Sequence, residues 1–115
     1  MTNDQARFYI AVRADLPPGL QMAQAVHAAS QFAVRYPELH AEWQRTSNFL
    51  VVVTVPDEWG LQRLGIGALR LAVNWTMVSE PDLNDECTAI ALSPGPGARR
   101  LCAQLPLALR DLAMA

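Results

Sequence analysis

Apolar and polar residues follow one another along this chain at spacings that predict both strands and helices. Residues 8–12 are a short apolar run between Arg7 and Arg13, and residues 49–55 form a longer run with a single threonine. Apolar runs of this length, rich in β-branched and aromatic residues, predict buried strands. Because the second run is apolar on both of its faces, we expect helices to cover it on both sides of a sheet.

The segment between these two strands predicts helices. From about residue 21 to residue 36, apolar side chains recur three and four positions apart, which places them on one face of an amphipathic helix. Two consecutive prolines precede that helix, and Pro37 ends it and begins a short second helix over residues 38–45. The polar residues of the first helix fall on a separate face, and they are Gln24, His27, Gln31 and Arg35.

The second half of the chain predicts two helices around a pair of strands. Asp57 and Glu58 place acidic side chains at the positive end of a helix dipole. Three glycines weaken that helix, and a close approach of its backbone to the sheet would explain one of them. A Pro-Gly-Pro-Gly turn opens the last helix, which Pro106 should kink or end early. We therefore expect a helix at 56–72, strands at 75–79 and 88–92 around a polar loop at 80–86, and a helix at 98–109.

The order of these elements predicts the fold class. Helices between the first three strands imply crossover connections, and therefore a layered α/β sheet. The third and fourth strands follow each other directly, which makes one strand antiparallel and the sheet mixed. A chain of 115 residues has room for little more than one domain, so we expect a single domain over residues 1–115.

The composition excludes several classes of function. The chain has nine arginines, no lysine and eleven acidic residues, which gives a net charge of −2. This balance argues against nonspecific coating of nucleic acid, although it allows a local arginine patch, and the missing lysine excludes a catalytic ammonium. The N-terminus has neither the basic nor the apolar segment of a signal peptide, and no apolar run approaches the roughly 18 residues of a membrane span. We therefore expect a cytoplasmic protein without membrane contact.

The cysteines and glycines form no recognised cofactor motif. Cys87 and Cys102 form neither a Cys-x-x-Cys pair nor a metal-ligand spacing with the two histidines. We interpret them as reduced thiols, with a disulfide as the alternative. The segment Gly95-Pro96-Gly97 is a turn rather than a phosphate-binding loop, because proline removes a backbone donor that such a loop needs.

Candidate chemistry lies at two places along the chain. Gln24 and His27 share a helix face just after the first strand, where α/β sheets bind ligands. A glutamine amide donates and accepts hydrogen bonds, and a histidine changes its proton state near neutral pH. Asp82 and Asp85 lie in the polar loop before Thr88, and a carboxylate beside a hydroxyl can position and deprotonate a water. The alternative is that all of these are ordinary solvated or hydrogen-bonded side chains.

Arg99 and Arg100 stand at the start of the last helix, where their charges oppose the helix dipole. Such a placement is unhelpful to the helix, so it favours contact with an anion or a partner. A solvated role for both side chains is the equally weighted alternative.

Two motifs then resemble the class II peptidyl-tRNA hydrolases. The N-terminal signature of that family resembles Val12-Arg13-Ala14-Asp15-Leu16, then Gly19, then Ala23-Gln24-Ala25-Val26-His27-Ala28-Ala29. The closing strand and turn of the family resemble Thr88-Ala89-Ile90-Ala91-Leu92-Ser93-Pro94-Gly95-Pro96. The order of elements agrees as well, and the resemblance covers about residues 7 to 110, with only the two end motifs specific.

The resemblance implies a three-layer α/β/α domain with a four-stranded mixed sheet, which is often a homodimer. Family members hydrolyse the ester between a peptide and the terminal ribose of tRNA, without a metal or an organic cofactor. The residues that match the family's functional positions are Gln24, His27, Asp82 (with Asp85 as a rival), Thr88 and Asp15. Phosphate contacts would come from Arg13, Arg99 or Arg100.

Two functions follow from this comparison. In the first, water attacks the ester with Asp82 or His27 as general base, Thr88 holds the water, and Gln24 stabilises the oxyanion. In the second, the chain is a binding or assembly module that keeps the fold without the chemistry. The second is favoured by a loop at residues 17–22 that is shorter than the family's and lacks its lysine, and by the acidic charge balance. A related acyl-transfer or small-molecule reaction in the same cleft is a third possibility.

Overall fold

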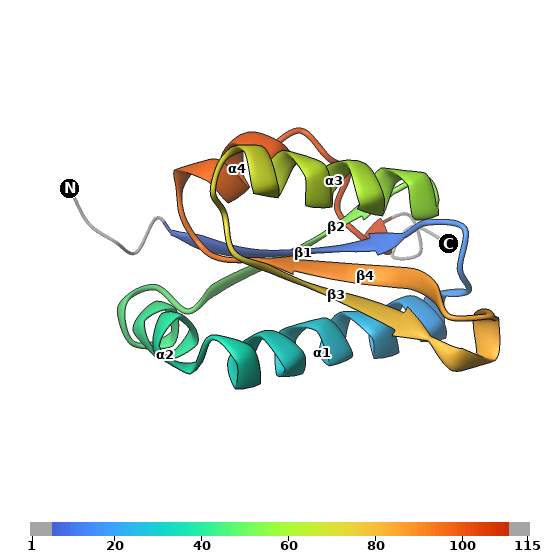
Figure 1. Cartoon of the computed structure of the whole chain (residues 1–115), viewed down its shortest axis with the longest axis horizontal. Coiled ribbons are helices and arrows are strands. Elements are labelled where there is room, and N and C mark those ends of the chain that lie inside the picture. Colours follow the sequence, from blue (N-terminus) through green and yellow to red (C-terminus); the bar gives the residue numbers. More distant parts are fainter. Residues whose placement is uncertain (1–5, 111–115) are drawn as a thin grey trace.

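The computed structural model of the chain describes residues 6–110, which fold into four strands and four α-helices around one sheet (Figure 1). The predicted elements are present, several with extended or shortened ends. In chain order they are β1 (Arg7–Arg13), α1 (Pro18–Arg35), α2 (Pro37–Thr46), β2 (Phe49–Val55), α3 (Glu58–Arg70), β3 (Trp75–Glu80), a short 3₁₀ turn (Pro81–Leu83), β4 (Glu86–Leu92) and α4 (Pro96–Cys102).

The sheet is mixed and has the order β2-β1-β4-β3. β1 and β2 run parallel, whereas β4 is antiparallel to both of its neighbours, β1 and β3. The carboxyl ends of β1, β2 and β3 therefore lie at the same edge of the sheet, where α1 begins. Figure 1 shows α1 and α2 on one face and α3 and α4 on the other, which confirms the three-layer α/β/α architecture and the four-stranded mixed sheet.

Successive side chains of β1 point to opposite faces of the sheet and contribute to two hydrophobic cores, one on each face. Phe8, Ile10 and Val12 pack toward α1 and α2, together with Phe32 and Trp43. The intervening residues of β1 join the second core under α3 and α4. Because the central strands are buried on both faces, their nearly continuous apolar runs follow from the layered architecture. The members of the second core that come from the sheet are Tyr9, Ala11, Val53, Val55, Ile90 and Leu92.

Helices cover both faces of the run at 49–55, as expected: Val53 and Val55 join the core under α3 and α4, and Val52 packs against the core under α1 and α2. The strand also lies at an edge of the sheet, which the sequence did not indicate. Phe49 and Leu50 are exposed at its start. Its outer edge is met by the segment that follows α4, where Leu107 bridges Val53 and the N–H of Ala108 donates to the carbonyl of Val52 at 2.9 Å. The chain's own C-terminal segment thus takes the place of a further strand.

The last helix is shorter than predicted. It ends at Cys102 rather than near residue 109, because Pro106 cannot continue a helix and the chain turns back toward β2. In α3, Gly60 is the glycine that lies against the sheet, since an added Cβ would stand 2.6 Å from the Cβ of Val55. Both cysteines are free thiols, and burial raises the pKa of Cys102 to about 12. None of the described helices is long and apolar enough to cross a membrane.

Candidate active site

Three side chains from distant parts of the sequence form a hydrogen-bonded chain where α1 passes over β3 and β4. The hydroxyl of Thr88 donates to Oε1 of Gln24 at 2.6 Å. The Nε2 of Gln24 in turn donates to Oε1 of Glu80 at 2.9 Å. Gln24 is 1% exposed and Thr88 is fully buried, whereas Glu80 is half-buried. We call these three residues the Thr88–Gln24–Glu80 relay, and it ends in a carboxylate at the surface.

A β-bulge places Thr88 in this relay. Val78 pairs with Ala89 and Ser79 pairs with Cys87, so that Thr88 is the extra residue of β4 between the two pairs. Simple alternation from Ile90, which packs under α3, would turn Thr88 away from α1. The extra residue breaks that alternation and directs its hydroxyl to α1. The sequence contains no sign of the bulge, because it depends on the register of two strands.

Glu80 is the site residue that the sequence analysis missed. We expected it in a loop, but it is the last residue of β3 and pairs with Glu86 across the hairpin. Thr76, Val78 and Glu80 alternate along β3, and the first two lie against α1. Extending the predicted strand by one residue would have placed Glu80 on the same face. Its second oxygen accepts the backbone N–H of Asp82 at 3.2 Å, so both carboxylate oxygens are held.

Arg13 and Asp15 form an ion pair at the end of β1. Nε and Nη2 of Arg13 each donate to one oxygen of Asp15 at 2.9 Å, and Nη1 donates to Glu86 at 2.7 Å and to the carbonyl of Cys87 at 3.1 Å. Hydrogen bonding to Arg13 holds the pKa of Asp15 below its ordinary value, and the same pair raises the pKa of Arg13. Arg13 is 7% exposed and anchors the strand that carries Thr88, so its guanidinium is engaged in fixing the hairpin.

The other predicted site residues lie apart from the relay. His27 is exposed on α1, one turn beyond Gln24, and the exposed Asp82 reaches the relay through its backbone N–H. Within the described residues neither side chain has a hydrogen-bond partner. Asp85 is exposed in the hairpin turn. At the opposite end of the sheet, α4 carries the exposed side chains of Arg99 and Arg100, and Arg99 lines a groove with Arg7 and Phe49, the first residues of β1 and β2.

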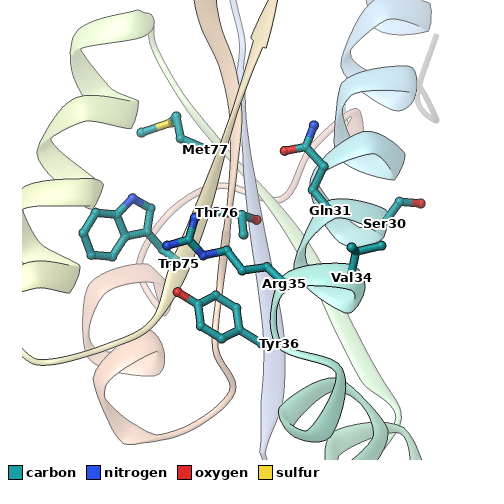
Figure 2. Close-up of a pocket in the computed structure, with 8 residues that line it drawn as sticks. All are labelled: Ser30, Gln31, Val34, Arg35, Tyr36, Trp75, Thr76 and Met77. Atoms are coloured by element: carbon teal, nitrogen blue, oxygen red, sulfur yellow. The ribbon is translucent and has the colours of Figure 1, made fainter.

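A groove of about 650 Å³ follows the outer edge of β3 beside the second half of α1. Figure 2 shows Arg35 extending from α1 toward the ring of Trp75, with the ring of Tyr36 beside it. The guanidinium carbon of Arg35 lies 5.5 Å from the centroid of the Tyr36 ring. The lining residues are Ser30, Gln31, Val34, Arg35, Tyr36, Trp75, Thr76 and Met77, and we call this the α1–β3 groove.

A metal centre is not indicated by the described part of the chain. Residues 6–110 hold no group of three or more histidine, cysteine, aspartate or glutamate side chains arranged to bind a metal ion. What the relay provides is a carboxylate fixed by two donors and connected to a buried hydroxyl. Such an arrangement can accept a proton from a water or a polar substrate, because each carboxylate oxygen has a second lone pair.

Comparisons with known proteins agree with the fold and extend the interpretation. A solved structure of a protein of unknown function from Agrobacterium tumefaciens strain C58 is similar with a TM-score of 0.66 at 12% identity, over 89% of this chain and 96% of that one. At this identity the likeness shows the fold alone. No curated protein matches the chain. The family model described as peptidyl-tRNA hydrolase PTH2 matches residues 6–105, and the chain belongs to that family.

Proposed function

We propose that this protein hydrolyses the ester between a peptide, or an aminoacyl group, and the 3′-terminal ribose of tRNA. Membership of the peptidyl-tRNA hydrolase family supports a hydrolase acting on tRNA-linked substrates. The observation that carries the proposal is the Thr88–Gln24–Glu80 relay, which ends in a half-buried carboxylate at the carboxyl edge of the sheet. Ligand sites of α/β sheets lie at such edges.

In the proposed reaction, Glu80 acts as general base. A water held by the free lone pairs of its carboxylate attacks the ester carbonyl and gives its proton to Glu80. The tetrahedral intermediate collapses, and the leaving ribose oxygen takes the proton back from Glu80, which restores the carboxylate. The products are a peptide carboxylic acid and tRNA with a free 3′ hydroxyl. Positioned general bases contribute about 10²- to 10⁴-fold in rate.

Glu80 takes the place that we assigned to Asp82 because of how the two side chains are held. Glu80 accepts hydrogen bonds at both oxygens, which fixes its orientation. The Asp82 side chain has no hydrogen bond within residues 6–110 and is exposed. His27 lies one helical turn from Gln24 and is the competing base.

Gln24 and Thr88 are positioning residues in this mechanism. Gln24 is 1% exposed and its amide already donates to Glu80 and accepts from Thr88. It therefore has little surface left to stabilise an oxyanion, the role that we predicted for it. Its contribution is to hold the carboxylate toward the substrate, and Thr88 fixes the orientation of the amide.

The substrate, the location and the assembly belong to the same proposal. We infer a cytoplasmic homodimer that acts on peptidyl-tRNA without a bound metal or organic cofactor, as the family resemblance implies. Light scattering tests the assembly, since a dimer has twice the chain mass of 12.6 kDa.

A second candidate function is a binding module that has lost the chemistry. The observation in its favour is that the polar side chains of the site form hydrogen bonds and ion pairs with one another. Gln24 and Thr88 are buried and bonded, and Arg13 is paired with Asp15 and Glu86. Such a network also stabilises a fold without catalysing anything. This candidate predicts no turnover and no shift of tRNA at low salt.

Hydrolysis of labelled peptidyl-tRNA separates these candidates. We expect turnover by the wild type and a loss of kcat of about 100-fold or more in Glu80→Gln, which keeps the hydrogen-bonding shape but removes the base. Glu38→Gln, an exposed change in α2, serves as the matched control and should keep full activity. Circular dichroism and thermal unfolding verify that each variant is folded.

Further variants identify the residue that acts as general base. Full activity in Glu80→Gln would eliminate Glu80, and a loss confined to His27→Ala or Asp82→Asn would transfer the role to that residue. Absence of turnover in the wild type, together with absence of tRNA binding, would favour the binding-module candidate over hydrolysis.

A further inference from the structure

The α1–β3 groove and the relay are built on the same two elements. α1 carries Gln24 of the relay and then Gln31 and Arg35 of the groove, and β3 carries Trp75 at its start and Glu80 at its end. At 1.5 Å per residue, Gln31 and Arg35 lie about 10 and 16 Å along the helix from Gln24. A molecule that reaches from one site to the other must therefore be extended, and only a few groups long.

The lining of the groove combines flat apolar surfaces with a positive charge. Trp75 and Tyr36 supply half-buried aromatic rings, and the exposed Arg35 supplies a guanidinium. No carboxylate lines the groove, and Arg35 makes no salt bridge within residues 6–110, in contrast to Arg13 and Arg45. The Arg35 charge is thus available to an anion from outside.

Polar groups for directed contacts complete the groove. Gln31 and Ser30 are exposed on α1, and Figure 2 shows the amide of Gln31 extending toward β3, whereas the hydroxyl of Ser30 points away from the groove. Trp75 has no hydrogen-bond acceptor for its indole N–H among the described residues. Among the described strands, β3 pairs with β4 alone. Its outer edge therefore also presents unpaired backbone groups.

The charge along this surface changes sign between its two ends. The relay end holds the carboxylates of Glu80, Asp82 and Asp85, whereas the groove end holds Arg35 without an acidic neighbour in the lining. A polyanion that lay across both ends would be repelled at the first. A ligand with phosphates at the groove end and an uncharged ester at the relay end matches the charge at both ends.

We propose that the α1–β3 groove binds the unpaired 3′-terminal nucleotides of the tRNA moiety, an inference that rests on the proposed function. A base stacks on Trp75 or Tyr36, and Arg35 pairs with a phosphate between two bases. The terminal ribose ester then extends along the α1 face of β3 toward Glu80, whereas Trp75, whose ring packs against the core under α3 and α4, borders the groove across the edge of the strand. Proteins that bind single-stranded nucleic acid combine positive charge along the backbone with aromatic side chains on which bases stack, and the groove supplies Arg35 for the first and Tyr36 and Trp75 for the second.

Binding of a short, end-labelled single-stranded RNA that ends in CCA tests the groove. By fluorescence anisotropy at low salt, we expect Trp75→Ala and Arg35→Ala each to weaken binding about tenfold. Trp75→Phe should retain most of the affinity, because it keeps a stacking surface. The matched controls are Trp59→Ala and Arg63→Ala, which change an exposed tryptophan and an exposed arginine on α3 that do not line the groove.

Kinetics with peptidyl-tRNA distinguish this proposal from the proposed function. In a working hydrolase we expect Trp75→Ala and Arg35→Ala to raise KM with little change in kcat, opposite to Glu80→Gln. If the RNA binds and the groove variants weaken it while no hydrolysis occurs, the groove assignment stands and the proposed function fails. If hydrolysis occurs and both groove variants keep wild-type KM and RNA affinity, the groove assignment is overturned.

Two further results count against the groove. The first is duplex RNA binding as tightly as the single strand, because paired bases cannot stack on the groove. The second is a homodimer that Arg35→Glu separates without changing RNA affinity, because the groove would then be covered by a second copy. Arg35 is exposed, so its variants should fold even if Trp75→Ala does not.

Discussion

At the scale of single residues, two buried polar side chains depend on each other. Thr88 and Gln24 are as buried as the core leucines, and each satisfies the other. A buried acceptor without a donor costs about 1–3 kcal/mol, whereas a satisfied pair stabilises only modestly. Removing one partner is therefore more harmful than removing both.

Thr88→Val tests this asymmetry. The methyl group replaces the hydroxyl without a large change in shape and leaves Oε1 of Gln24 without its donor. We expect the free energy of unfolding to fall by about 1–3 kcal/mol in urea titrations. In a Gln24→Met background the same substitution should cost much less, because no buried acceptor is left unpaired. Equal costs in both backgrounds would show that Thr88 stabilises by packing alone.

Asp15 makes the stability of the protein depend on pH in the acidic range. Because the pKa of Asp15 is lowered in the folded state by Arg13, its ionised form stabilises the fold above its ordinary pKa, and this contribution is lost as pH falls through the lowered value. We expect Asp15→Asn to lower stability at pH 7 by about 1 kcal/mol, a modest value because water screens an aspartate that is 43% exposed. The gap between wild type and variant should close as pH falls from the ordinary aspartate pKa of 3.8 through the lowered pKa of the folded state. A gap that is constant with pH would contradict this account.

At the scale of elements, helix α3 shows how a helix is fitted to a sheet. Gly60 lies against Val55 of β2, where a Cβ would clash at 2.6 Å. Gly65 also faces the interior, yet its nearest neighbour for an added Cβ is Met77 at 3.6 Å, an ordinary contact. The two glycines look alike in the sequence, but only the first is required by packing.

Paired substitutions distinguish the two glycines. We expect Gly60→Ala to destabilise the protein by about 1–3 kcal/mol, because β2 has to move away. Gly65→Ala should stabilise it by up to about 1 kcal/mol, since alanine is the better helix former and the space is present. Thermal unfolding followed by circular dichroism measures both. A loss of stability in Gly65→Ala would mean that the space near Met77 is smaller than the structure indicates.

At the scale of the whole molecule, the two edges of the sheet are treated differently. The radius of gyration is 13.4 Å, which is the value expected for a compact chain of this length. The edge of β2 is paired in part by the segment after α4, whereas the edge of β3 borders the α1–β3 groove. An unpaired edge strand invites association with another chain, so the covered edge protects the molecule.

Ala108→Pro tests that protection. Proline removes the N–H that Ala108 donates to Val52 and should detach the segment from the edge. We expect lower stability by about 1–2 kcal/mol and concentration-dependent association in light scattering. Ala108→Ser, which keeps the N–H, is the control and should behave as the wild type. Identical behaviour of the two variants would show that the segment contributes nothing to the edge.

Much of the fold could be predicted from local patterns. The apolar run at 49–55 and the helical spacing after Pro17 gave elements close to those of the structure. The position of β2 at an edge could not be predicted, because the apolar pattern of a strand does not show which strands pair with it on either side. The candidate site was predicted in part. Gln24 and Thr88 meet, but Glu80 was missed, because its strand continues one residue beyond the apolar pattern.

By itself, the sequence determined which residues are apolar, where prolines stop helices, and that lysine chemistry is excluded. These properties are local, since each depends on the side chain and its near neighbours. The tertiary structure decided which polar groups meet: a bulge in β4 turns Thr88 toward Gln24, and the hairpin brings Glu80 to the same helix. It also placed α4, which carries Arg99 and Arg100, at the end of the sheet opposite the relay. Such placements depend on strand register and order, which are fixed only when the whole sheet assembles.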